Sequence, residues 1–300
     1  MALILVTGGC GFIGINLVEK LIQDGHAVRV LDNNAYSAVS MLPEGVEFFE
    51  GSASDPVILS EAFRGVARCV HLAGTSVLKD PRQEQVESIQ PFMASVEPLF
   101  MAACAAGADV VYASSAAVYG ETRTTPIRED TPLRPISAHG MEKLALETCA
   151  SRYAEQKGVA SLGLRMFNVF GPGQNPKSPY CGVVRKFADQ LLNGTPVTIH
   201  GDGSQKRDFV FVDDATDCIV KAVAAPWSGA DVVNVCSGEP VTVKDVVSAL
   251  EHVFNRRFVI TYKEAAKTMI SASVGDPAKG RRVFGFRPSR PFSDAVEFMA

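Results

Sequence analysis

The sequence contains no apolar run long enough to cross a bilayer, no block of basic residues and no group of residues with metal-ligand spacing. Its 300 residues carry a formal net charge of −4, so nothing favours binding to the phosphates of nucleic acid. The first residues, Met1 to Val6, lack the charged start and the cleavage site of a signal peptide and lead into an apolar strand. We therefore expect a cytoplasmic protein that binds neither membranes nor nucleic acid.

Cysteine and histidine are present, but neither is arranged for metal binding. The seven cysteines form no CxxC pair, and the five histidines show no ligand spacing. Scattered cysteines of this kind usually behave as small buried apolar residues in a reducing compartment. We expect no metal site.

The first half of the chain alternates short apolar strands with longer helical stretches. Strands are expected at Leu3–Thr7, Ala27–Leu31, Val46–Phe49, Arg68–Leu72, Val110–Ala113 and Ser161–Met166. Helices are expected at Ile13–Gln23 and Glu97–Ala106. This alternation predicts an α/β fold with a doubly wound parallel sheet of the Rossmann type, covered by helices on both faces.

After Gly171 the pattern changes, because glycine and proline interrupt the chain. A helix at Val183–Leu192, a strand at Val197–His200 and a strand at Asp208–Val212 after the loop Gly201–Arg207 are expected there. We therefore divide the chain into a nucleotide-binding domain at 1–170 and a smaller C-terminal α/β substrate lobe at 171–300. Segments near 208–236 are candidates for a return to the first domain.

Three glycines follow the first strand and open the first helix. Gly8, Gly11 and Gly14 have a spacing that lets the backbone turn tightly and lets a diphosphate approach the helix N-terminus. The second strand ends at Asp32, whose carboxylate can bind ribose hydroxyls and would repel a 2′-phosphate. No arginine or lysine flanks Asp32, so the pattern favours NAD over NADP. The alternative is an ordinary glycine turn.

Further motifs follow in order along the chain. They are Thr7–Gly14 (TGGCGFIG), His71–Gly74 (HLAG), Ser114–Gly120 (SSAAVYG), Arg165–Gly173 (RMFNVFGPG), Gly201–Phe209 (GDGSQKRDF) and Asn234–Gly238 (NVCSG). Together they resemble the extended short-chain dehydrogenase/reductase family, in its branch of NAD-dependent nucleotide-sugar epimerases and dehydratases. The resemblance runs from Thr7 to about Gly238 and continues weakly to Phe286.

The resemblance implies roles for individual residues. The cofactor would be held by Gly8, Gly11, Phe12, Ile13, Gly14, Asp32, Asn33, Asp55, Leu72, Ala73, Gly74 and Lys143. The nucleotide sugar would be held by Ser115, Asn168 and Arg207, with Lys267 as a candidate for a further phosphate contact. A guanidinium suits bidentate binding of a diphosphate, although Arg207 could instead be a surface arginine paired with Asp208 or Asp202. Asn168 and Ser115 could equally be structural residues at a turn and a strand end.

One position departs from the family pattern. The family transfers protons with Tyr-x-x-x-Lys on one helix face, and here the lysine is Lys143 but the tyrosine is replaced by His139. His139 could be the general base, since a neutral imidazole accepts a proton near pH 7. Otherwise the protein binds NAD and a nucleotide sugar without efficient turnover, or Ser115 or Lys143 takes over the proton transfer.

The resemblance also narrows the reaction. Family dehydratases carry an Asp-Glu pair where this chain has Ala116 and Ala117, which argues against a dehydratase. We expect a nucleotide-sugar epimerase that acts at C4 of a UDP-sugar through a transient keto sugar, with Ser115, His139 and Lys143 as catalytic residues. The alternatives are a binding protein impaired by His139 and a nucleotide-sugar ketoreductase. The family further suggests a homodimer through the helices near Glu97–Ala106 and Lys143–Gln156.

Overall fold

The computed structural model describes residues 2–34, 39–74, 89–122, 124–176, 178, 181–265 and 269–299. Among these residues, seven parallel strands form one sheet in the order β10-β6-β5-β4-β1-β2-β3. The strands are β1 (Leu3–Thr7), β2 (Ala27–Asp32), β3 (Glu47–Glu50), β4 (Arg68–His71), β5 (Asp109–Ser115), β6 (Ser161–Met166) and β10 (Ala230–Val235). The predicted doubly wound parallel sheet is confirmed.

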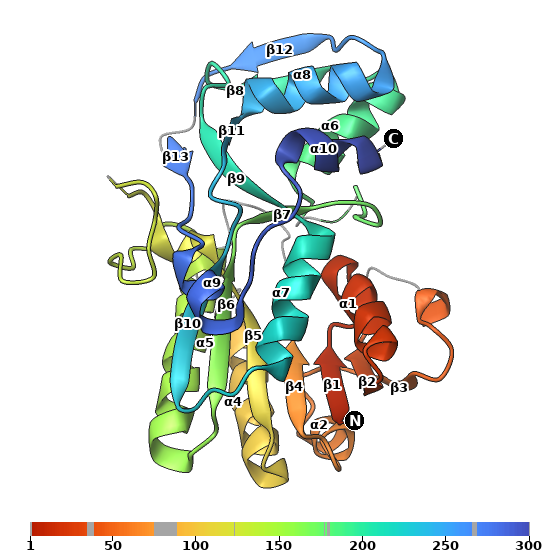
Figure 1. Ribbon diagram of the computed structural model, residues 1–300, viewed down its shortest axis with the longest axis vertical. Helices are drawn as coiled ribbons and strands as arrows, with labels where there is room; N and C mark the ends of the chain where they lie inside the picture. The colour runs from red at the N-terminus through yellow and green to blue at the C-terminus, as the bar shows by residue number, and fades with distance from the viewer. Residues whose placement is uncertain are drawn as a thin grey trace.

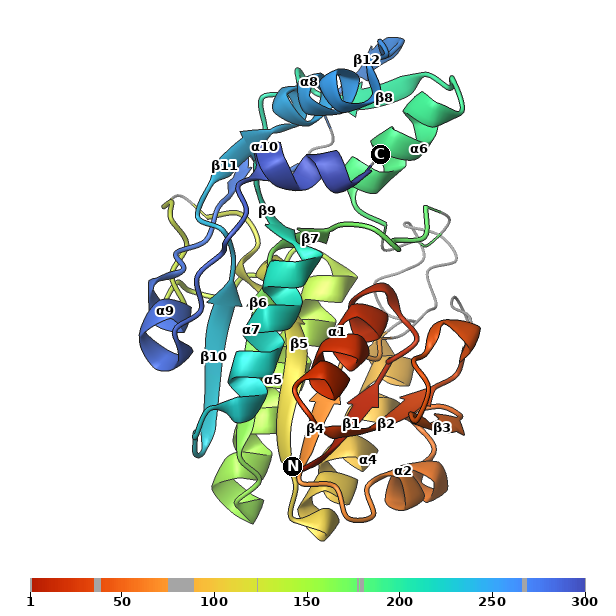
Figure 2. The ribbon, with the colours of Figure 1, turned by 45° about the vertical axis from the view of Figure 1, so that its right-hand side comes forward.

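Helices cover both faces of this sheet, as Figures 1 and 2 show. One face carries α1 (Phe12–Gln23) and α7 (Val212–Ala224), which share one apolar core cluster with the strands. The opposite face carries α2 (Pro56–Ala62), α4 (Ile89–Ala106) and α5 (Ala138–Lys157) around a second cluster. All six residues of β6 are buried, which is why its sequence lacks the alternation of a half-exposed strand.

The strand order reverses direction at β1. From β1 the chain passes outward through β2 to β3, and then crosses back to β4 on the other side of β1. Ligands of such sheets bind beyond the carboxyl ends of the strands at this switch point. Thr7, Asp32, His71 and Ser115 end the strands β1, β2, β4 and β5, so the predicted site residues share one edge of the sheet.

The rest of the chain forms a smaller lobe above that edge (Figures 1 and 2). Its apolar core cluster draws on helices α6 and α8, the neighbouring strands and the C-terminal helical turns. Its elements are β7 (Asn168–Phe170), α6 (Val183–Leu192), β8 (Val197–His200), β9 (Lys206–Phe211), β11 (Pro240–Thr242), α8 (Val243–Phe254), β12 (Ile260–Lys263), β13 (Ala272–Ser273), α10 (Phe292–Ala295) and η3 (Val296–Met299). The short elements η1 (Val39–Met41), η2 (Ala116–Tyr119) and α9 (Ala278–Phe284) lie beside the large sheet.

The chain passes between the two parts more than once. Strand β9 belongs to the smaller lobe. The next two elements return to the large sheet: α7 packs on it, and β10 is the edge strand of that sheet. The expected strand at Asp208–Val212 is shifted: β9 begins at Lys206, and Val212 already starts α7. Arg207 therefore lies within a strand that pairs with β11 and β13, and the interpretation of its position as a loop was wrong.

Among the described residues, no helix is both long and apolar enough to span a membrane.

Candidate active site

The loop between β1 and α1 is so compact that a side chain has no room at Gly8 or at Gly14, the glycine that follows in α1. Gly8 has a φ of +74°, and a Cβ on it would lie 2.6 Å from the Ala73 nitrogen. A Cβ on Gly14 would lie 2.4 Å from the Gly8 carbonyl oxygen. Gly11 takes the N-cap position of α1 and has no side chain to cap the first amides. These N–H groups and the helix dipole are therefore available to an anion at the carboxyl edge of the sheet.

Asp32 is oriented by backbone groups on either side of it. One carboxylate oxygen accepts a hydrogen bond from the Cys10 amide at 3.0 Å, and the other accepts one from the Asn34 amide at 2.7 Å. Each oxygen keeps a lone pair for a further donor such as a ribose hydroxyl. Among the described residues, no lysine or arginine forms an ion pair with Asp32.

The other predicted cofactor residues lie around this loop. The backbone of Leu72 and Ala73 contacts Gly8, and Gly74 follows as an exposed residue. The partly buried side chains of Phe12 and Ile13 pack against the cores of the smaller lobe and of the large sheet, respectively. A glycine cradle, an open helix N-terminus and a carboxylate one strand away fit the diphosphate and adenosine ribose of NAD.

Asp55 has a structural role that the sequence analysis did not assign to it. Its carboxylate caps α2 by accepting hydrogen bonds from the Val57 amide at 2.9 Å and the Ile58 amide at 3.3 Å. The turn before it is tied to the end of β2, because the Gly51 amide donates to the Asp32 carbonyl oxygen. Asp55 thus lies on the Asp32 side of the site, as does Asn33, which is exposed.

His71 is buried beside the glycine loop. Its Nδ1 lies 2.7 Å from the Thr7 hydroxyl, so the ends of β4 and β1 are joined by a side-chain hydrogen bond. Burial and, secondarily, the Lys143 ammonium lower the pKa of His71 to about 3. The imidazole is therefore neutral at physiological pH.

His139 and Lys143 lie on one face of α5, one turn apart. The helix starts at Ala138, and the Ser137 hydroxyl caps it by accepting from the Gly140 amide at 3.1 Å. Burial and the charge of Lys143 lower the pKa of the half-buried His139 to about 4. Burial also lowers the pKa of Lys143 to about 8, although Glu142 opposes this. Lys143 is therefore close enough to both His71 and His139 for its charge to lower the pKa of each imidazole.

Ser115 ends β5 close to the start of α5. Its hydroxyl accepts a hydrogen bond from the Ala117 amide at 3.1 Å and so caps η2. A Cβ on Gly140 would lie 2.5 Å from the Ala117 carbonyl oxygen, so η2 and the first turn of α5 are in direct backbone contact. The structure thus brings together the segments that carry the three predicted catalytic residues.

A buried polar network lies behind these residues, and the sequence analysis did not identify its central member, Glu147. The Glu147 carboxylate binds Arg165 through two hydrogen bonds of 2.9 and 2.8 Å, and the Ser114 hydroxyl donates to it at 2.5 Å. Arg165 also donates to the Tyr119 hydroxyl at 2.9 Å, and Tyr119 donates to Asn234 Oδ1 at 2.6 Å. The available signal was the helical spacing from Lys143 to Glu147, which places a second charge on the buried face of α5.

Asn168 and Arg207 meet in the smaller lobe above the strand ends. Asn168 Nδ2 donates to the Asp208 carbonyl oxygen at 2.8 Å, next in the chain to Arg207. Neither Asp208 nor Asp202 pairs with Arg207. Asp208 instead accepts from Ser237, Gly238 and Gly275, whereas Asp202 accepts from Ser204.

Arg207 is therefore not held by the acidic partners that a surface arginine would use. Its guanidinium donates to the Lys206 carbonyl oxygen at 2.8 Å, and its partial burial lowers its pKa. Lys267 lies outside the described residues.

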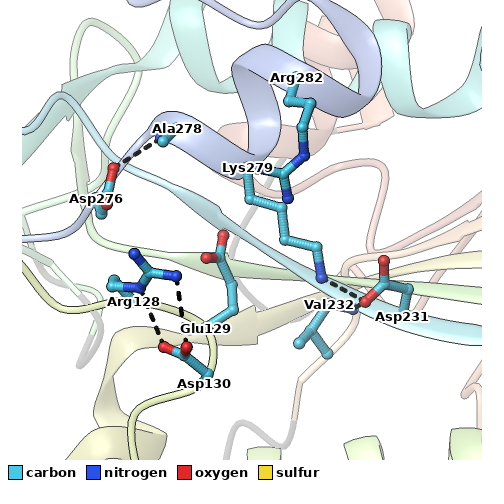
Figure 3. Close-up of a pocket in the computed structure, with 9 residues that line it drawn as sticks. All are labelled: Arg128, Glu129, Asp130, Asp231, Val232, Asp276, Ala278, Lys279 and Arg282. Carbon is cyan, nitrogen blue, oxygen red and sulfur yellow. Dashed lines mark hydrogen bonds and ion pairs between the residues drawn. The ribbon is translucent and has the colours of Figure 1, made fainter.

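A separate cavity of about 410 Å³ lies at the outer edge of the large sheet, between β10, α9 and the segment 128–130 (Figure 3). Its charged groups are largely paired with one another, with Lys279 2.5 Å from Asp231 and Arg128 3.2 Å from Asp130. None of the predicted site residues lines it. We therefore place the candidate site at the strand ends.

Comparison with known proteins places this architecture among nucleotide-sugar enzymes. Residues 4–236 match the model of the NAD dependent epimerase/dehydratase family. A UDP-glucose 4-epimerase of Mycolicibacterium smegmatis is 30% identical over 302 residues, which cover 97% of this chain and 95% of the relative.

Two solved structures are also similar over nearly the whole chain. One is the UDP-glucose 4-epimerase of Thermotoga maritima with UDP-glucose (TM-score 0.92, 28% identity, 99% of this chain and 97% of that one). The other is the UDP-glucose 4-epimerase of Thermus thermophilus in complex with NAD (TM-score 0.90, 31% identity, 99% and 97%). The predicted family and NAD as its cofactor are confirmed, and the chain belongs to the NAD dependent epimerase/dehydratase family.

Proposed function

We propose that this protein is a nucleotide-sugar epimerase that inverts C4 of a UDP-sugar, with His139 as its general base. The observation that carries the proposal is the His139–Lys143 pair, which begins α5 at the same sheet edge as the glycine loop and Asp32. The relatives support the substrate class, since the Thermotoga epimerase structure holds UDP-glucose.

The protonation states of the site leave His139 free of a proton and Lys143 charged at neutral pH. A pKa of about 4 leaves His139 neutral above pH 5, so its imidazole has a lone pair for a sugar hydroxyl proton, and the same low pKa makes it a weaker base than an ordinary histidine. Lys143 is mostly charged at pH 7, since its pKa is lowered to only about 8. Burial and the Lys143 ammonium together keep His139 neutral, and the ammonium is a donor for the cofactor ribose. The Ser115 hydroxyl can share the hydrogen bond to the reacting sugar oxygen.

The two substrate residues have complementary roles. The Arg207 guanidinium presents N–H donors to the diphosphate, for which its planar fork is suited. Asn168 keeps its amide oxygen available as an acceptor, because the hydrogen bond to Asp208 uses the amide nitrogen. NAD supplies a reversible hydride acceptor when it is bound. Asp32, which no lysine or arginine flanks in the sequence, selects it over NADP.

The direct test is proton NMR of the protein incubated with NAD and a panel of UDP-, dTDP- and GDP-sugars. We expect a C4 epimer to appear from a UDP-sugar, with no net consumption of reduced cofactor. Net consumption of reduced cofactor would instead identify a ketoreductase. If every sugar stays unchanged while NAD and UDP bind, the epimerase proposal is wrong and the protein is a binding protein impaired by His139.

The matched variants are His139→Ala and His139→Tyr. Loss of turnover in the first variant separates the base proposal from proton transfer by Ser115 or Lys143. A large gain of turnover in the second would indicate that His139 impairs the reaction.

Assembly as a homodimer through α4 and α5 stays a prediction, as does the cytoplasmic location. In support of the dimer, Met101 is a large apolar side chain of α4 that is 59% exposed. Light scattering on wild type and Met101→Glu tests it: we expect a dimer that the charged variant weakens. A monomeric wild type would contradict the prediction.

A further inference from the structure

The buried network around Glu147 joins every element that carries a candidate catalytic group. Ser114 precedes Ser115 at the end of β5, Glu147 follows Lys143 by one turn of α5, and Arg165 lies on β6. Tyr119 belongs to η2, and Asn234 lies near the end of β10. These five residues include members of three of the sequence motifs, yet they contact one another at the centre of the fold.

Arg165 is the centre of this network. Its Nε and Nη2 hold the two oxygens of Glu147, and its Nη1 donates to the Tyr119 hydroxyl and to the Glu129 carbonyl oxygen at 3.0 Å. The guanidinium also lies 4.9 Å from the centre of the Tyr119 ring. Arg165 and Glu147 are only 3% and 9% exposed. A bidentate pair fixes both distance and angle, which a single charge contact does not.

The network extends to the segment between η2 and α5. Glu129 Oε1 accepts from the Asn234 amide at 2.8 Å, and Asn234 Nδ2 donates to the Ile127 carbonyl oxygen at 2.9 Å. The segment that leads into α5 is therefore hydrogen-bonded to the same network as α5 itself. The helix is held at its third turn by Glu147 and at its start by the backbone contact between Gly140 and Ala117.

We propose that the Glu147–Arg165 pair is a positioning device that fixes α5 against the ends of β5 and β6, so that His139 and Lys143 face Ser115. Neither residue touches the reacting atoms. The inference rests on the proposed roles of His139 and Lys143, and it assigns a function to motif residues that cofactor and sugar binding leave unexplained.

The physical argument is that apolar packing alone does not fix the rotation of α5. Its buried face includes Glu142, Lys143 and Glu147 together with small and apolar residues, so apolar packing alone does not define one orientation. A small rotation of the helix would move His139 and Lys143 away from the strand ends. Displacements of about 1 Å are enough to slow a reaction by about a hundredfold.

The chain offers a matched control for this test. Arg29 is likewise a buried arginine, 8% exposed, that binds Glu47 and lies 5.3 Å from the centre of the Phe49 ring. It also donates to the carbonyl oxygens of Ala62 and Arg64, as Arg165 does to that of Glu129. Arg29 lies on β2, far from α5. Its replacement therefore shows how much destabilisation follows from the loss of a buried arginine pair alone.

The experiment compares three full-length variants with wild type. Glu147→Leu combined with Arg165→Met replaces the pair by apolar groups of similar size, a change that usually preserves folding. Arg165→Lys keeps the charge but not the bidentate geometry. Arg29→Met is the control. For each we measure the thermal midpoint, the NMR titration of His139, the affinity for NAD by calorimetry, and kcat and KM separately.

We expect the double variant to raise the His139 titration midpoint by about one pH unit or more, since a displaced imidazole is better solvated. Its kcat should fall about tenfold to a hundredfold with a smaller change in KM, because misplacement acts on the reacting groups. Arg165→Lys should lie between the double variant and wild type. Arg29→Met should lower the thermal midpoint without moving the His139 titration.

The proposal is overturned if the folded double variant has the His139 titration and kcat of wild type. It is also overturned if Arg29→Met shifts the titration as much as the double variant does. If the double variant does not fold, Arg165→Lys decides between the same two outcomes. The titration needs no turnover, so it remains decisive even if wild type proves to have no epimerase activity.

Discussion

The glycine loop after β1 and the first turn of α5 face the same site, but different interactions determine their structures. In the loop, the conformation is set by backbone sterics, since a Cβ at Gly8 or Gly14 would lie 2.6 Å or less from backbone atoms. At the start of α5, the backbone is ordinary helix, and the chemistry depends on side chains that a buried polar network holds in place. The difference explains how the chain can keep a family cofactor site while it replaces a tyrosine by His139.

The largest effect is expected from breaking the loop. Gly8→Ala places a Cβ against the backbone of Ala73 at a φ of +74°, which we expect to cost about 2–4 kcal/mol of folding free energy and to abolish NAD binding. Chemical denaturation and calorimetry measure the two effects. Gly65→Ala is the control, because Gly65 has a φ of +72° but open space around it. Equal losses in both variants would mean that steric closure of the loop is unimportant.

A smaller effect, confined to the reaction, is expected at α5. His139→Ala should lower kcat by about 10²- to 10⁴-fold, the usual contribution of a general base. Stability and NAD affinity should change little, because the helix is capped by Ser137 and not by His139. Kinetics with the substrate that the NMR panel identifies would check this. A variant as active as wild type would remove His139 from the mechanism.

Asp32 depends on both the backbone and the side chain, because backbone amides orient the carboxylate that binds the cofactor. Asp32→Asn keeps an acceptor but removes the charge and turns one oxygen into a donor that faces the Cys10 or Asn34 amide. We expect a loss of about tenfold to a hundredfold in NAD affinity and a smaller preference over NADP. Calorimetric titration with both cofactors measures this, and an unchanged NAD/NADP ratio would argue against the assigned role.

The smallest effect is expected at Arg207. Arg207→Lys keeps the charge but loses the fork geometry, so KM for the nucleotide sugar should rise about fivefold to tenfold with little change in kcat. The thermal midpoint should stay the same, since the guanidinium has only the carbonyl oxygen of Lys206 as a described partner. A fall in stability with unchanged KM would assign Arg207 to the structure instead.

The same contrast explains what could be predicted from the sequence. The strand Ser161–Met166 and the helix Val183–Leu192 have the predicted bounds, because apolar runs and helical periodicity depend on local sequence. The glycine spacing predicted the loop for the same reason. Asp55 was assigned to the cofactor, but its capping of α2 is also local and could have been recognised from the Pro56 that follows it.

Long-range contacts were not predictable in this way. Glu147 and Arg165 are 18 residues apart in the chain, and Asp208 binds residues 29, 30 and 67 positions away. Arg207 was expected in a loop because its polar neighbours lack the apolar pattern of a strand. The strand there is defined only by its pairing with β11 and β13. Polar networks of this kind leave no periodic signal in one sequence.

The pH dependence of kcat/KM tests the central claim, that His139 is the general base, most directly. The base must be neutral, and its pKa is about 4, while Lys143 must be charged, and its pKa is about 8. Wild type should therefore lose activity as the pH falls through about 4 and again as it rises through about 8. In His139→Tyr the acid limb should move to higher pH, because tyrosine must lose its proton to act as a base. Acid limbs at the same pH in wild type and variant would contradict the account.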